Sequence, residues 1–260
     1  MSRVRLVALA LAFAALVFLL REFARVGLAA TVVQAPAPAT VTGTVGLGAR
    51  VDPVLMGARV PDSSTRAHGR DAIESAGDRT YLPAMFGETD SVVRRWDDTD
   101  AGEIKVAYVL GEVPGWGPED QAIAREAFTT WERAGLPVHF TEVLDTADAQ
   151  MIVRWVPHFS FDRSGQTDLT WDGEGRIHRA VLQLALADTA GHTIPEEGLR
   201  AVALHEVGHA LGLPHSDRVD DLMYPTTRHP VMTERDLATI HLLYSLPPGS
   251  IKWSAPSSSH

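Results

Sequence analysis

The sequence predicts an α+β fold, because stretches with the period of a strand and stretches with the period of a helix follow one another along one domain-sized segment. Five short apolar stretches between residues 104 and 186 are typical of strands. Three longer segments carry apolar residues on one helical face, and two of them follow the last strand. Since 45% of the 260 residues are apolar, a packed core is expected.

The first predicted strand covers residues 104–110, IKVAYVL, in which apolar and polar residues alternate. A helix is expected next, at 118–134, with Pro118 in a first helical position and Gly135 ending it. The apolar face of this helix consists of Ile123, Ala127, Phe128 and Trp131. Four more strands are predicted, the third of them a short or edge strand, at 137–143, 149–155, 165–171 and 176–186.

Two helices are predicted after the strands. The first begins near Thr193, which has capping-box spacing to Glu196, with Pro195 in the first turn, and it closes at Gly212. The second covers residues 233–246, and two prolines follow it directly. Its inward residues are expected to be Leu237, Ile240 and Tyr244.

The N-terminus predicts export from the cytoplasm. Arg3 and Arg5 precede an unbroken apolar run at residues 6–20, which is long for the core of a signal peptide and short for a membrane span. Residues 1–30 are therefore interpreted either as a signal peptide or as an N-terminal membrane anchor through residues 6–20. Both alternatives make the rest of the chain extracytoplasmic, secreted or anchored.

The remaining chain divides by composition into three parts. Residues 31–90 are rich in Ala, Pro, Thr, Gly and Ser and are expected to be a linker or a pro-segment. Residues 91–247 contain all the predicted strands and helices and form the folded domain, while residues 248–260 are expected to be a flexible tail.

Charge and cysteine content exclude several classes of function. The net charge of −10 argues against nucleic acid as a partner, because phosphate binding needs a basic face. The chain has no cysteine, which excludes disulfides, thiol catalysis, iron–sulfur clusters and thiolate zinc sites. Any transition metal must therefore be held by His, Asp or Glu side chains. We expect a monomer.

The most informative stretch is HEVGHALGLPH, residues 205–215. On a helix, His205 and His209 lie one turn apart on the same face, close enough to share a metal ion. Gly212 can take a positive φ, so the chain can turn there and bring His215 back as a third ligand. Three imidazoles leave the fourth position of a tetrahedral zinc ion for water, which is the arrangement of a catalytic site.

Glu206 follows the first histidine directly and lies about 100° around the helix from it, beside the metal position. A carboxylate there suits a general base that acts on a metal-activated water and later passes the proton to a leaving amine. The sequence therefore predicts amide hydrolysis with one zinc ion and one carboxylate.

With Met223 eight residues after His215 in DLMYP, this segment resembles the matrixin branch of the metzincin zinc metalloproteases. The resemblance implies a zincin catalytic domain over residues 91–247, with a twisted mixed sheet of about five strands packed on a backing helix and an active-site helix, and a C-terminal helix. It implies a zinc endopeptidase that holds a protein or peptide substrate extended along an edge strand, for which 165–171 is our choice. Met223 would form an apolar floor below the imidazoles, and Tyr224 and Pro225 would line the specificity pocket.

Some features depart from the family pattern or leave alternatives open. Matrixin latency uses a cysteine that this chain lacks, so Glu88 or Asp90 could cap the zinc in a precursor instead. Asp172 and Glu174 in WDGEGR could bind calcium, although a solvated hairpin turn is the preferred interpretation. The histidines expected to lie on the surface or in packing, not at a second zinc, are 68, 139, 158, 178, 192, 229 and 241. A catalytically inert zincin-fold binding or adhesion module with structural zinc remains the alternative function.

Overall fold

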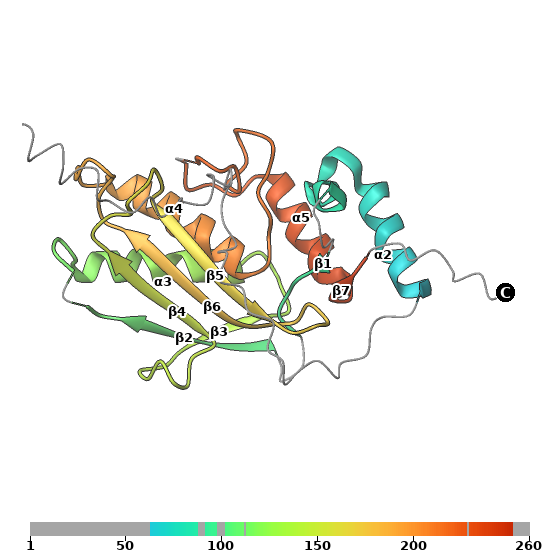
Figure 1. The fold of residues 1–260 in the computed structure, drawn as a ribbon, viewed down its shortest axis with the longest axis horizontal. Coiled ribbons are helices and arrows are strands. Elements are labelled where there is room, and N and C mark those ends of the chain that lie inside the picture. Colours follow the sequence, from blue (N-terminus) through green and yellow to red (C-terminus); the bar gives the residue numbers. More distant parts are fainter. Residues whose placement is uncertain (1–62, 88–91, 98–101, 112, 228, 252–260) are drawn as a thin grey trace, which may run out of the picture. The chain divides into compact units, whose positions relative to one another are not determined.

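The computed structural model describes residues 63–87, 92–97, 102–111, 113–227 and 229–251, and its largest sheet has five strands (Figure 1). Its strand order is β3-β2-β4-β6-β5. Four strands pair in parallel and β5 pairs antiparallel with β6, so the sheet is mixed and β5 lies at an edge, as predicted. The strands are β2 (Glu103–Val109), β3 (His139–Glu142), β4 (Met151–Val156), β5 (Gly165–Trp171) and β6 (Ile177–Ala185).

The two faces of the sheet differ because side chains alternate along each strand. One face carries the large apolar residues of the main core, including Ile104, Val106, Met151, Val153, Leu169 and Leu182. The other face carries a small cluster of Ala107, Ala149 and Ile152. The face with the main apolar core must be covered to exclude water, and two helices cover it.

Helices α3 (Pro118–Glu132) and α4 (Glu196–Ala210) pack against each other and on the apolar face of the sheet (Figure 1). A buried hydrogen bond also joins the two helices: the indole Nε1 of Trp131 donates to the carbonyl oxygen of Leu204 at 2.8 Å. Helix α3 begins at Pro118 as predicted, and Gly135 follows it at φ +78°. The prediction of an α+β fold, with a mixed five-stranded sheet packed on two helices, is confirmed.

The start of α4 differs from the prediction. The helix begins at Glu196, Pro195 is its N-cap residue, and no side chain caps it. Thr193 instead pairs with Ala187 in an isolated antiparallel bridge. The residue before a proline is disfavoured in helical conformation, so Ile194 stays extended and the helix cannot begin earlier. The predicted capping box at Thr193 was therefore wrong.

Ordered structure extends beyond residues 91–247 at both ends. Within the expected linker or pro-segment lie α2 (Ser63–Ala76) and the 3₁₀ helices η2 (Gly77–Arg79) and η3 (Leu82–Gly87). At the other end β7 (Gly249–Ser250) pairs antiparallel with β1 (Val92–Val93), so the expected tail is in part a strand. Helix α5 (Glu234–Ser245) begins with a capping box between Thr233 and Asp236.

The described residues all belong to one structural unit, Thr42–His260. Among them, every helix is too short or too polar to cross a bilayer. The predicted signal peptide or anchor at residues 1–30 lies outside the described residues, as do Glu88, Asp90 and the end of the expected tail from residue 252.

Candidate metal centre

Three imidazoles converge at the C-terminal end of α4. His205 and His209 lie on the helix, and His215 lies on the loop that follows it. One ring nitrogen from each histidine lies within 4.8 Å of the others, and this is the one such group of three metal-binding side chains among the described residues. The helical spacing explains the first pair, and the return of the chain brings in the third imidazole.

Backbone carbonyls fix the orientation of the two helical imidazoles. Nδ1 of His205 lies 2.8 Å from the carbonyl oxygen of Leu222, and Nδ1 of His209 lies 2.8 Å from that of Leu213. A carbonyl oxygen can only accept, so both Nδ1 atoms carry the proton and both Nε2 atoms present a lone pair. Metal-binding histidines are oriented by such bonds.

The outward nitrogens fit a metal ion. Among the described residues, the buried Nε2 atoms of His209 and His215 have no hydrogen-bond partner. Burial lowers the pKa of His205, lowers that of His209 well below its ordinary value, and lowers that of His215 to about 3. The imidazoles are therefore neutral at physiological pH, which is the form that binds zinc. Buried, unpartnered nitrogens are costly unless a ligand satisfies them.

The turn after α4 depends on Gly212, which takes the positive φ that the sequence predicts, +105°. A second constraint was not predictable: a Cβ at this position would overlap the carbonyl oxygen of Arg94. The amide of Gly212 donates to His209, and the amide of Leu213 donates to Gly208. These bonds close the helix and direct the chain toward His215.

Met223 lies fully buried beside α4. A Cβ on Gly208 would come within 2.5 Å of its sulfur, so the helix has a glycine where the methionine packs. The carbonyl of Met223 accepts a hydrogen bond of 2.8 Å from the amide of Ser216, which ties this turn to the residue after His215. Tyr224 and Pro225 follow and are half-buried.

Glu206 is buried against the edge strand β5. Its Oε2 accepts a hydrogen bond of 2.6 Å from the hydroxyl of Thr167, which is fully buried. A Cβ on Gly165 would overlap the Glu206 carboxylate, so this strand leaves space for the side chain. Burial raises the pKa of Glu206 to about 7, against the lowering effect of the Thr167 hydrogen bond and the positive charge of Arg163.

Sequence reasoning missed Thr167 as a partner of Glu206. The signal that was present is alternation, because residues 165, 167 and 169 share one face of β5 and α4 packs on this strand. That pattern places Thr167 inward, but the strand's pairing with β6 and its contact with α4 are not encoded in local spacing.

The segment WDGEGR forms the predicted hairpin turn between β5 and β6, but its carboxylates are not solvated. Asp172 and Glu174 are buried, and both form ion pairs with Arg176. Asp172 also lies 3.3 Å from Nε2 of His178. The expectation of a solvated turn was wrong because a cation within the turn allows the carboxylates to be buried. The seven histidines assigned to the surface or to packing are all exposed.

Comparison with known proteins shows similarity to metalloendoproteinases and a matrix metalloproteinase. The chain is similar to Metalloendoproteinase 1-MMP of Arabidopsis thaliana, 29% identical over 142 residues, which are 48% of this chain and 37% of that protein. It is 33% identical over 137 residues to human Matrix metalloproteinase-19, covering 48% of this chain and 26% of that protein. Metalloendoproteinase 1 of Glycine max is 25% identical over 202 residues, 73% of this chain and 63% of that protein.

The chain thus spans less than two thirds of the length of these relatives. A family model, that of the matrixins, matches residues 106–245, which run from β2 to the last turn of α5 and include the three-histidine centre. Because this match covers more than half of the 260 residues, the chain belongs to the matrixin family of peptidases.

Proposed function

We propose that this protein is a zinc-dependent endopeptidase. The observation that carries the proposal is the convergence of three neutral imidazoles, two of them with buried and unpartnered Nε2 atoms, beside a buried carboxylate. His205, His209 and His215 would hold one zinc ion, and Met223 would pack below them. When bound, zinc supplies Lewis-acid polarisation of the scissile carbonyl and activation of a water molecule.

Glu206 acts as the general base. Its carboxylate accepts a proton from the attacking water and then delivers that proton to the nitrogen of the leaving amine. The water oxygen becomes bonded to the carbonyl carbon, the C–N bond breaks, and the products are a carboxylic acid and an amine. Thr167 holds Oε2 of Glu206 at 2.6 Å, which limits the orientations of the carboxylate.

The substrate is a protein or peptide held extended along β5. Among the described residues this strand is an edge of the sheet, so one side of its backbone could pair with an added strand. The same strand carries Thr167, the partner of Glu206, so a peptide paired with β5 would lie near Glu206. Tyr224 and Pro225 are proposed to line the pocket for the substrate side chain.

Export and assembly are also proposed from the sequence. The apolar run at residues 6–20 would direct the chain out of the cytoplasm, either as a cleaved signal peptide or as an anchor. The domain would then act as a monomer, and nucleic acid would not be a partner, in accord with the net charge of −10.

The test is cleavage of casein and of quenched fluorescent peptides by the full-length protein. We expect activity that a chelator abolishes and added zinc restores. Glu206→Gln should lower kcat by about 100-fold or more, because general acid–base groups contribute at least that much. Glu197→Gln, an exposed carboxylate in the first turn of the same helix, is the matched control.

One outcome favours the inert binding module instead. If wild type and Glu206→Gln both bind zinc and both fail to cleave every peptide in a broad library, the endopeptidase proposal is contradicted.

A further inference from the structure

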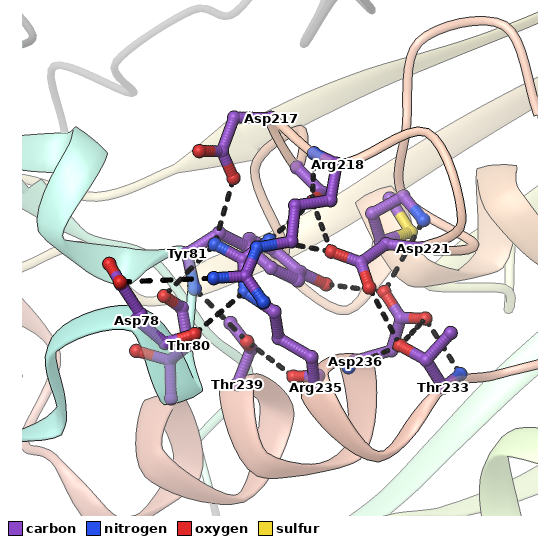
Figure 2. A network of polar contacts seen from close by, with 12 residues as sticks. Asp78, Thr80, Tyr81, Asp217, Arg218, Asp221, Thr233, Arg235, Asp236 and Thr239 are labelled. Atoms are coloured by element: carbon purple, nitrogen blue, oxygen red, sulfur yellow. Dashed lines mark hydrogen bonds and ion pairs between the residues drawn. The ribbon is translucent and has the colours of Figure 1, made fainter.

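A polar network joins three segments that lie far apart in the sequence (Figure 2). Arg235 and Asp236, in the first turn of α5, form its centre. On one side are residues 78–81, within the segment expected to be a linker or pro-segment. On the other is the loop 216–223, which begins directly after His215 and ends at Met223. These contacts are called here the Arg235–Asp236 network.

Arg235 holds the loop through three side chains. Its Nη1 donates to the hydroxyl of Ser216 at 2.9 Å and to Oδ2 of Asp221 at 2.6 Å, and its Nη2 donates to Oδ1 of Asp217 at 2.8 Å. Ser216 also donates to the buried carboxylate of Asp221. The loop 216–223, which directly follows His215, is therefore held at its first two residues and at Asp221 by one guanidinium.

The same guanidinium also binds residues 78–81. Nε donates to the carbonyl oxygen of Asp78 at 3.1 Å, and Nη2 donates to that of Thr80 at 3.3 Å. The five N–H donors of Arg235 thus meet five acceptors, and the side chain is only 11% exposed. A lysine has a single donor centre and cannot reproduce this fork.

Asp236 connects the segment to the imidazole of His205. Its Oδ1 accepts from the hydroxyl of Tyr81 at 3.1 Å, and its Oδ2 accepts from the amide of Leu222 at 2.8 Å. The carbonyl oxygen of Leu222 accepts from Nδ1 of His205. One residue, Leu222, therefore lies between the carboxylate and the imidazole, and Tyr81 contacts the opposite side of that carboxylate.

We propose that residues 78–81 are a permanent part of the metal-site scaffold, with Arg235 and Tyr81 as positioning residues that hold the loop 216–223 for metal binding. The inference rests on the proposed metal centre but not on peptidase activity. Without Arg235, the buried Asp221 loses its only cationic partner among the described residues. The loop would then have to rearrange so that water solvates the Asp221 carboxylate. Because His215 directly precedes this loop, its imidazole would be displaced as well. Removing the segment as a pro-peptide should weaken the centre, not activate it.

The test measures zinc affinity in the full-length protein by competition with a chromogenic chelator. Arg235→Lys and Tyr81→Phe should each weaken zinc binding about 10-fold or more, as loss of the partners that orient metal ligands does in general. Arg125→Lys is the matched control, because Arg125 forms an exposed ion pair with Glu142 on the sheet edge away from the centre. Near-ultraviolet circular dichroism establishes that each variant is folded at the temperature of the measurement.

Two further readouts separate positioning from packing. The visible spectrum of the cobalt-substituted protein reports ligand geometry, and it should change in Arg235→Lys but not in Arg125→Lys. Coupling between two sites is reciprocal, so zinc should slow hydrogen exchange at the amide of Tyr81, which donates to Thr239 at 3.3 Å. Unchanged affinity and cobalt spectra in both network variants would overturn the proposal.

Failure of this inference and failure of the proposed function can be told apart. A wild-type chain that binds zinc but cleaves no peptide would contradict the endopeptidase, while the affinities of the variants would still decide on the network. A wild-type chain with no affinity for zinc would overturn both.

Discussion

At the scale of single residues, the orientation of the Glu206 carboxylate depends on residues of another element. The carboxylate extends from α4 and is met by Thr167 and Gly165 of β5. Because Thr167 is fully buried, its hydroxyl serves this contact and is not available to substrate or solvent. A general base contributes most when its orientation is fixed before substrate binds. The hydroxyl is therefore expected to influence turnover more than binding.

Thr167→Val should lower kcat for peptide cleavage about 10-fold and leave KM nearly unchanged, since valine has a similar shape but no donor for Oε2 of Glu206. Thr167→Ser keeps the hydroxyl and should retain most of the activity. Steady-state kinetics on a quenched peptide with both variants makes the comparison. Equal kcat values in the two variants would mean that the hydroxyl has no orienting role.

At this scale the sequence predicted contacts between residues that are close along the chain and missed a contact between residues that are far apart. His205, His209 and Glu206 lie within one helical turn, so their relative placement follows from helix geometry alone. The contact between Thr167 and Glu206 spans 39 residues and depends on which strand α4 packs against. No local pattern contains that information.

At the scale of elements, the end of α4 depends on one glycine. Gly212→Ala should destabilise the domain by about 3 kcal/mol or more, because the residue has φ +105° and its new Cβ would overlap the Arg94 carbonyl oxygen. Gly191→Ala is the control, since Gly191 has φ +85° but no atom within 4 Å of a Cβ there. Denaturant unfolding of the zinc-free proteins gives both values. If the two variants lose equal stability, the overlap with Arg94 has no cost beyond backbone strain.

The turn between β5 and β6 should contribute a pH-dependent stability. Burial raises the pKa of Asp172, but hydrogen bonds from the amides of Arg176 and Glu174 and the contact with His178 outweigh it, so the pKa lies below its ordinary value of 3.8. A carboxylate with a lowered folded-state pKa stabilises the fold above its unfolded pKa, and this stability is lost as pH falls through the folded value.

Asp172→Asn should therefore reduce the free energy of unfolding at pH 7 and have a smaller effect near pH 3. Urea unfolding at the two pH values measures the difference. Asp148→Asn, at an exposed turn position, is the control and should show little change at either pH. A loss for Asp172→Asn that is the same at both pH values would contradict the assignment.

The sequence predicted some helices and strands closely and missed others, depending on how clear their apolar periodicity is. The strand at 165–171 coincides with β5, and α5 lies within one residue of its predicted bounds, because both have clear periodicity and clear stop signals. Helix α2 was missed because Ile73 is its only large apolar residue, so its sequence has no repeated large apolar position to mark a helix. The segment after it is held by Tyr81, Leu82 and Met85 in the main core and by Arg235.

At the scale of the whole molecule, strand order was beyond the reach of periodicity. The parallel pairing of β2 with both β3 and β4 needs chain crossovers, and alternation along a strand does not specify its neighbours. The mixed sheet was implied by the resemblance to matrixins, which the HEVGHALGLPH motif carried. Local chemistry thus predicted the convergence of the three imidazoles, but it did not predict the order of the strands around them.

Zinc should stabilise the whole domain and not only the site. The folded chain presents three neutral imidazoles whose ring nitrogens lie within 4.8 Å of one another, whereas the unfolded chain has no such arrangement. A ligand that binds only the folded state at 1,000 times its Kd adds about 4 kcal/mol of stability. For a domain of this size that corresponds to a rise in Tm of roughly 8–16 °C.

Differential scanning calorimetry of the full-length protein, with zinc and with chelator, measures this shift. His215→Gln should abolish most of it, because the chain then keeps only the two helical imidazoles. His139→Gln, at an exposed position on β3, should leave the shift intact. A shift that survives in His215→Gln would mean that zinc stabilises the protein at some other place, and the three-histidine centre would no longer explain the coupling between metal and fold.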